Sequence, residues 1–179
     1  MRTKGCIGRP RRDLSDSWRR ACAGGAAVAA FASAAMTLYW TVGGTAFLDT
    51  VGGWAEDAAR QRDAGAIMVG VVVVAAKLVG GGLALALFGP DRFRHERLLV
   101  RVAKVAGVVL VVYGTASVIG AALGLVGVAG DEVDRQALWG HALVWDPWFV
   151  VWGALLWLAA RVPGRAIRAP IDRHRESRS

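Results

Sequence analysis

The sequence contains few of the residues on which disulfide-rich proteins, metalloproteins and most enzymes depend. Among its 179 residues there are two cysteines, Cys6 and Cys22, and three histidines. Both cysteines lie in or next to a basic N-terminal segment that is expected to face the reducing cytoplasm, so no disulfide is predicted. No Cys/His spacing resembles a zinc site, and the G-x-S-x-G, H-E-x-x-H, Walker A and dinucleotide-binding glycine motifs are absent. The sequence therefore predicts no metal and no cofactor.

Charged residues are also scarce, and they are nearly excluded from the long apolar runs. They make up 20% of the chain, whereas 55% of it is hydrophobic. A soluble domain of this length is usually about 45–50% apolar. Only Lys4, Lys77 and Lys104 are lysines among the 22 basic residues. Together with the abundance of alanine, glycine and valine, this preference for arginine indicates GC-rich codon usage and a bacterial source.

Four apolar runs predict an all-α fold, that of a polytopic membrane protein with a four-helix transmembrane bundle. A helix of about 20 apolar residues crosses the bilayer core. The runs cover residues 21–42, 64–88, 105–129 and 147–162. Together they form a transmembrane domain of residues 21–162. Basic tails of residues 1–20 and 163–179 flank this domain, and the first tail is expected to be disordered.

The first and last spans each leave two interpretations open. The first run also resembles a secretory signal peptide, but it continues to Trp40, beyond the small residues of the cleavage position at 32–34, which favours an uncleaved span. In the fourth span, Asp146 and Pro147 are expected to be the N-cap and the first helical residue. Because the remaining helix is short, either it begins earlier and Pro147 kinks it, or the protein thins the bilayer.

The distribution of basic residues predicts the orientation. Eighteen of them lie before residue 21, between residues 92 and 104, or from residue 161 onward, whereas the outer loops hold only Arg60, Arg62 and Arg135. Positive loops stay in the cytoplasm, so both termini are predicted inside, in a multi-pass protein of the bacterial inner (plasma) membrane. Because the charge flanks apolar spans, it argues for contact with the bilayer and its anionic lipid headgroups and against nucleic acid as a partner.

Small residues at four-residue steps predict close packing between helices. Gly25, Ala29 and Ser33 follow this spacing in the first span, and Gly120 and Gly124 follow it in the third. Transmembrane helices associate through such small residues because lipid provides no hydrophobic drive between them. Packing within one chain is the favoured interpretation, and a homo-oligomer is the alternative.

Lys77 is the one ionisable residue near the middle of an apolar run. A charge at that depth is costly, and intramembrane ionisable residues are functional by default. No acid occurs inside any span, so a hydrogen bond to Tyr113, at a similar predicted depth, or to backbone carbonyls is the structural alternative. The functional interpretation is that Lys77 binds an anionic group or relays a proton.

Aromatic residues gather on the predicted outer side. An interfacial belt is the favoured explanation for most of the eight tryptophans. However, Trp145 and Trp148 have helical spacing and can line one face beside Tyr39 and Trp40, which would wall a pocket. His141 lies five residues before Asp146, but a lone pair of this kind is more often structural than a metal site.

Two segments resemble a known family. Residues 38–44 contain Tyr-Trp-x-x-Gly-Gly, similar to a signature that ends the first span in small bacterial membrane proteins of the domain-of-unknown-function group numbered 3995. Residues 137–153 resemble the beginning of that family's last span, with Trp-Asp-Pro-Trp where other members have Tyr-Ser-Pro. The resemblance covers about residues 21–160. It implies a four-helix inner-membrane protein and no assigned activity.

Three function classes follow, in decreasing order of support. The first is the binding or transport of a small amphiphilic or anionic ligand in an outward-facing pocket inside the bundle, lined by Lys77, Tyr113, Tyr39, Trp40, His141, Trp145, Asp146 and Trp148. The second is a structural subunit that assembles a membrane complex through glycine-rich helix faces. The least expected is a membrane enzyme that uses Lys77, His141 or Asp146.

Overall fold

The computed structural model describes residues 10–88, 97–128 and 134–161, and these residues form helices and turns without any strand. The order of elements is α1 (Pro10–Thr41), η1 (Leu48–Thr50), α2 (Gly53–Gln61), α3 (Ala64–Phe88), α5 (Arg97–Leu125), α6 (Arg135–Gly140), η2 (His141–Trp145) and α7 (Asp146–Arg161). The predicted all-α class is confirmed.

Four helical segments are long and apolar enough to cross a membrane. They are Asp16–Thr41, Ala64–Phe88, Arg97–Leu125 and Arg135–Arg161. Large apolar side chains cover their outer faces, such as Val79 of α3 and Val109 of α5, which are 73% and 59% exposed. Side chains of this kind are stable in contact with lipid, not with water. The prediction of a polytopic four-helix membrane protein is therefore confirmed at the level of class.

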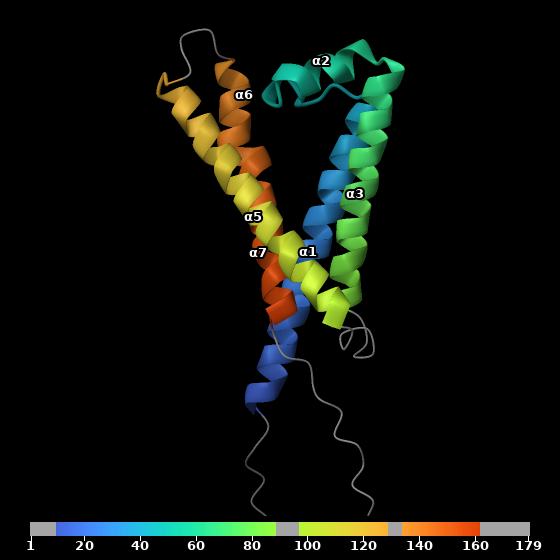
Figure 1. Cartoon of the computed structure of the whole chain (residues 1–179), viewed down its shortest axis with the longest axis vertical. Helices are drawn as coiled ribbons and strands as arrows, with labels where there is room; N and C mark the ends of the chain where they lie inside the picture. The colour runs from blue at the N-terminus through green and yellow to red at the C-terminus, as the bar shows by residue number, and fades with distance from the viewer. Residues whose placement is uncertain (1–9, 89–96, 129–133, 162–179) are drawn as a thin grey trace, which may run out of the picture.

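The helices form two arms that meet in a V. Helix α1 packs along α3 in one arm, and α5 packs along α7 in the other. Contacts between α1 and α7 join the arms, whereas α3 and α5 have little contact (Figure 1). Helix α2 lies across the open end of the V, next to the upper ends of α1 and α3 (Figure 1).

Alanines and two large residues build the core where the arms join. Helix α1 contributes Ala23, Ala26 and Ala30, each with no exposed surface. They pack in one cluster with Trp152 and Leu156 of α7. Small side chains let helix backbones approach closely, which increases van der Waals contact in a membrane.

Three glycines set the close approach of α5 and α7. A Cβ atom at Gly107 would lie 2.8 Å from the Gly153 carbonyl oxygen, and one at Gly153 would lie 2.6 Å from the Gly107 oxygen. A Cβ at Gly114 would lie 2.6 Å from the Asp146 oxygen. The obstructing atoms belong to the backbone and cannot rotate away. These positions, not the Gly120/Gly124 pair, mediate packing between the two helices.

The predicted small-residue patterns are only partly used within the chain. A Cβ at Gly25 would lie 3.1 Å from the Leu155 side chain, so this glycine does pack against α7. Gly124 faces Leu138, whereas a Cβ at Gly120 would meet nothing within 4 Å. Gly120 and Gly124 therefore do not form one packing surface inside the chain.

The N-terminal tail predicted to be disordered up to residue 20 is partly helical, because α1 already begins at Pro10. Arg19 lies in this extension and is 1% exposed, and its guanidinium donates a hydrogen bond to the Leu87 carbonyl oxygen. Leu87 is in the last turn of α3, where carbonyls lack helical partners and carry partial negative charge. Arg19 thus caps α3, a role that charge counting along the sequence does not reveal.

The fourth span begins earlier than Asp146, which decides between the two interpretations of its short length. Asp134 is the N-cap, accepting hydrogen bonds from the backbone N–H groups of Gln136 and Ala137. The helix continues through the π-helical turn η2, where the Asp146 N–H donates to the His141 oxygen. Asp146 is therefore inside the helix, and the expectation that it is an N-cap is wrong. The wider turn ends at Trp145, two residues before Pro147, which lacks the N–H of a regular helix.

Candidate functional site

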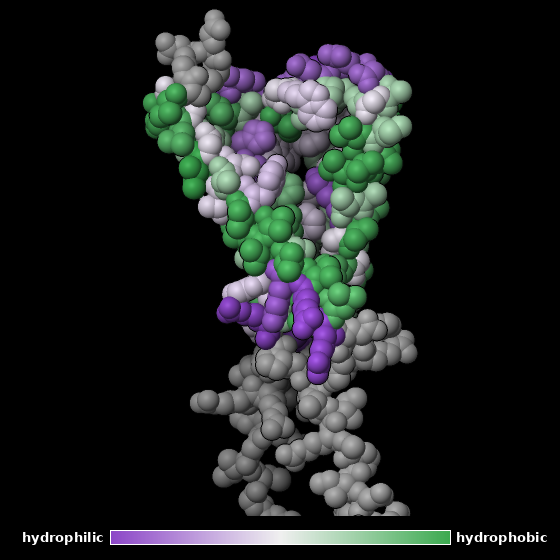
Figure 2. Space-filling view, viewed as in Figure 1, coloured by the Kyte–Doolittle hydropathy of each residue, from purple (hydrophilic) through white to green (hydrophobic). Residues whose placement is uncertain are grey.

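A cavity of about 590 Å³ lies between the two arms. Its walls come from α1, the segment of residues 47–55, α3, α5 and the α6–η2–α7 helix. Figure 2 shows hydrophobic outer faces on both arms and hydrophilic groups in the hollow between them. Binding sites for small molecules usually have volumes of about 300–1,000 Å³, mostly apolar walls and a few polar groups. The cavity has these properties.

Seven of the eight predicted site residues line this cavity: Lys77, Tyr113, Trp40, His141, Trp145, Asp146 and Trp148. Tyr39 does not. Its ring packs against Gly44, and its hydroxyl accepts a hydrogen bond from the Ala46 N–H, so it shapes the turn after α1. The expectation that Tyr39 walls the pocket is therefore wrong. Neighbouring helix positions point in different directions, and only Trp40 of the pair faces inward.

Lys77 places an ammonium group on the wall of the cavity. The group donates to the Thr37 hydroxyl at 2.7 Å and to the Ser33 carbonyl oxygen at 3.4 Å, both on α1. It also lies 5.5 Å from the centroid of the Phe149 ring, a cation–π distance. Among the described residues, no carboxylate forms an ion pair with Lys77. Within the part of the chain that the structure describes, the groups that contact this ammonium are all neutral.

Tyr113 lines the cavity but is not a hydrogen-bond partner of Lys77 in the described structure, and both residues contact the Phe149 ring. The Tyr113 ring meets Phe149 edge-on at 5.4 Å, and Phe149 stacks on Trp152 at 6.2 Å. Phe149 was not among the predicted site residues. Its position one residue after Trp148 and three before Trp152 gave no sign that it would approach Lys77.

Thr37 is the second site residue that sequence reasoning missed. It lies four residues after Ser33, so both face the same side of α1 and together accept hydrogen bonds from Lys77. A hydroxyl one helical turn from a serine inside an apolar span is a signal that was available in the sequence.

Two tryptophans connect separate parts of the cavity wall through their indole N–H groups, and a third contacts one of them through its ring. Trp148 of α7 donates to the Ala29 oxygen of α1 at 3.0 Å. Trp145 donates to the oxygen atoms of Thr50, and its ring meets Trp40 edge-on at 5.1 Å. These rings are parts of the wall with specific hydrogen bonds, and they join the two arms.

His141 lies between Asp146 and the segment of residues 48–52. Its Nδ1 is 3.0 Å from Asp146 Oδ2, and its Nε2 is 2.9 Å from the Val51 carbonyl oxygen. The Asp146 side chain is 2% exposed and that of His141 is 35% exposed. Among the residues described, no group of three or more His, Cys, Asp or Glu side chains is arranged to hold a metal ion.

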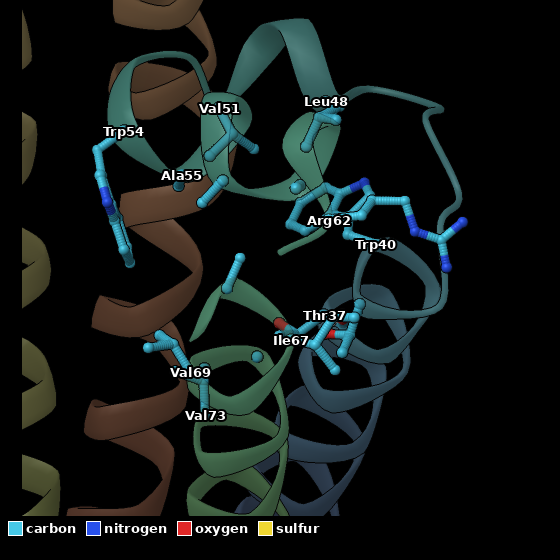
Figure 3. A pocket seen from close by; sticks show the side chains of 15 residues that line it. Thr37, Trp40, Leu48, Val51, Trp54, Ala55, Arg62, Ile67, Val69 and Val73 are labelled. Atoms are coloured by element: carbon cyan, nitrogen blue, oxygen red, sulfur yellow. The ribbon is translucent and has the colours of Figure 1, made fainter. Parts of the chain in front are cut away.

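A second, smaller cavity of about 220 Å³ lies beneath α2. Figure 3 shows Thr37 and Trp40 on one side of it and Trp54, Val69 and Val73 on the other. Both cavities share Thr37, Trp40, Val51 and Ala55 as lining residues. The Thr37–Trp40 edge of α1 and the Val51–Ala55 segment therefore separate the two spaces.

The four apolar helices and the cavity between them define a polytopic membrane protein with an internal binding-site geometry. Residues 30–156 match the family model described as "Protein of unknown function (DUF3995)", which is well over half of the chain. The chain belongs to this family, and the resemblance inferred from its first and last spans is confirmed. No curated protein and no solved structure matches the chain.

Proposed function

We propose that this protein binds, and moves within the membrane, a small amphiphilic ligand whose anionic head contacts Lys77. The single observation that carries the proposal is an ammonium group on the wall of an apolar cavity with no carboxylate partner among the described residues. A buried charge without a counter-ion is costly, so a bound anion is the natural partner.

The head group has a hydrogen-bond donor available to it. An ammonium carries three hydrogens, and Thr37 and Ser33 accept two of them. The third hydrogen and the positive charge support contact with one carboxylate or phosphate oxygen. One ammonium balances one negative charge, which favours a ligand with a small, singly charged head.

The walls favour an apolar tail. Trp148, Phe149 and Val144 line the cavity with apolar surface. Since lipid is as apolar as these side chains, burial of the tail contributes little net free energy in a membrane. The walls therefore select the shape of the tail, and the head at Lys77 supplies most of the affinity.

Native mass spectrometry of the protein released from lipid nanodiscs tests the proposal. We expect a bound mass on the wild type that is lost in Lys77→Met, because a hydrogen bond to a charged group contributes about 1.5–3 kcal/mol, or roughly tenfold to a hundredfold in affinity. Lys104→Met removes an equal charge from α5 outside the cavity lining and should retain the ligand. The proposal is wrong if the wild type carries no ligand or if Lys77→Met retains it equally.

The second candidate function is assembly of a membrane complex. It is supported by Gly120, which is exposed and has open space around its Cβ position. Another helix packing there would use a surface that this chain leaves uncovered. The same mass spectra report the number of chains per particle, and a strictly monomeric particle would argue against a homo-oligomer.

The proposed location is a bacterial inner membrane, with both termini in the cytoplasm and α2 at the outer surface. The excess of basic residues in the N-terminal, central and C-terminal segments supports this orientation. The cavity then opens towards the outer side, since α2 lies across the open end of the V (Figure 1).

Cysteine labelling of intact cells tests the orientation. In a chain with Cys6→Ser and Cys22→Ala, a single cysteine in place of the exposed Asp57 of α2 should react with a membrane-impermeant maleimide. A cysteine in place of the exposed Arg101 of α5 should react only after the cells are opened. The reverse pattern would contradict the charge argument.

A further inference from the structure

The segment of residues 48–52 ties one arm of the V to the other, and we call it the outer loop. It follows α1 in the chain, and three of its residues contact side chains of α6 and η2 within hydrogen-bonding distance. His141 contacts the Val51 oxygen, Trp145 donates to Thr50, and Gln136 donates to Asp49 at 2.5 Å. Thr50 and Val51 also line the large cavity. The outer loop is thus a part of the cavity wall that side chains of the opposite arm hold in place.

The two contacts of His141 require two hydrogens on the His141–Asp146 pair. A neutral imidazole beside an ionised carboxylate carries only one. The Val51 carbonyl can only accept, so Nε2 must carry a hydrogen. Nδ1 and Asp146 Oδ2, 3.0 Å apart, then need a second hydrogen between them, on either the imidazole or the carboxyl group. A neutral imidazole has only one N–H. When the pair loses its proton, one of the two hydrogen bonds is therefore lost.

The buried partner decides which bond breaks. Asp146 is 2% exposed, and an ionised carboxylate at such a position strongly requires a donor. The remaining imidazole hydrogen therefore moves to Nδ1 and donates to Asp146. Nε2 then presents a lone pair to the Val51 oxygen, which is repulsive. The result is the release of the outer loop from His141.

We propose that the His141–Asp146 pair is a proton-binding site that controls access to the large cavity: the protonated pair holds the outer loop closed, and release of the proton to water loosens it by removing one of its three contacts with the opposite arm. This inference rests on the proposed function, since it assigns a regulator to that ligand site. Ligand exchange would then be coupled to the loss of a proton from the outer end of the cavity.

Other titratable groups surround the pair and must be separated from it. Lys77 of α3 and Tyr113 of α5 share the cavity with it. On the outer side, Asp49 of η1 bonds Gln136, and Asp134 and Arg135 lie at the start of α6. On α2, Glu56 and Arg60 form an ion pair with each other. The linings contributed by α1 and α7 hold no other ionisable group than Asp146 itself.

Two substitutions should have opposite effects. In Asp146→Asn, the side-chain amide can donate to Nδ1 of a neutral imidazole while Nε2–H donates to Val51, so both bonds form without an added proton. This variant should stay closed at every pH. In His141→Phe, neither bond exists, so only the contacts of Trp145 and Gln136 still hold the outer loop, and it should be loosened at every pH.

Electron spin distance measurements in lipid nanodiscs test the proposal without any ligand. Spin labels at the exposed positions of Asp57 on α2 and Arg135 on α6 report the separation of α2 and its outer loop from α6. Between about pH 5 and about pH 9, the wild-type background should change from one narrow distance to a longer, broader distribution. Asp146→Asn should keep the narrow distance throughout, and His141→Phe should show the broad one throughout. Lys77→Met should respond to pH as the wild type does.

The outcomes separate the two proposals. A wild-type distance that does not change with pH, or an Asp146→Asn variant that still responds to pH, overturns the proton site even if a ligand is found on Lys77. A response that disappears in Lys77→Met assigns the titration to Lys77 and also overturns it. The pH response with the two opposite variants supports it, and the ligand proposal is then decided by the mass spectra alone.

Discussion

Replacing Gly107 with leucine is expected to separate α5 from α7 and to destroy the folded arm. A Cβ atom there would already lie 2.8 Å from the Gly153 oxygen and 2.9 Å from the Trp157 Cβ, so a larger side chain cannot be accommodated. Overpacking of a core usually costs about 1–3 kcal/mol when side chains can adjust. Because the obstructing atoms at Gly107 include backbone atoms, we expect a loss of stability at the upper end of that range or above it. The measurement is the fraction of monodisperse protein on size exclusion in mild detergent after heating.

The matched control for this prediction is Gly120→Leu on the same helix. A Cβ at Gly120 meets nothing within 4 Å, so this change adds the same side chain without a clash inside the chain. We expect its monodisperse fraction after heating to stay close to that of the wild type. If Gly107→Leu and Gly120→Leu lose monodisperse protein equally, glycine content alone, and not the close approach of α5 to α7, determines stability.

Replacing Arg19 with leucine is expected to release the end of α3 from α1. The guanidinium is buried and donates to the Leu87 oxygen, one of the terminal carbonyls of α3. Loss of a hydrogen bond from a charged group costs about 1.5–3 kcal/mol. For a chain of this size that corresponds to a fall of roughly 5–10 °C in melting temperature. Thermal unfolding followed by helical circular dichroism in detergent measures it.

Arg20→Leu is the control for Arg19, because the two arginines are adjacent and Arg20 is exposed. Both variants remove one positive charge from the same segment, so any effect on membrane orientation is the same in both. Only Arg19→Leu should lower the melting temperature. If the melting temperatures of both variants fall equally, Arg19 acts as one of the positive charges of this segment and not as a helix cap.

The spans could be predicted because their signal is local. A run of apolar residues longer than the bilayer core has few alternatives to a helix, whatever it packs against. The ends of the helices were less predictable. The sequence pattern places Arg19 in a basic tail and predicts that a helix begins at Asp146-Pro147. In the structure, both Arg19 and Asp146 are buried within helical segments.

The sequence predicted most of the residues that line the candidate site. It did not predict which residues they contact. Seven residues chosen for their chemistry and depth line one cavity. The partner of Lys77 is Thr37, forty positions earlier in the chain, and not Tyr113. Which residues meet across helices depends on how each helix is rotated about its axis, and apolar runs with little amphipathic pattern do not encode that rotation.

The sequence by itself determined that this chain has four apolar helices, three clusters of basic residues outside them and one lysine where a charge is costly, because hydropathy and charge act residue by residue. Only the tertiary structure decided that α5 and α7 meet at Gly107 and Gly153, that Lys77 lies over Phe149, and that His141 joins Asp146 to the outer loop. These contacts join positions far apart in the chain or on different helices, and their free energy exists only after the helices have packed.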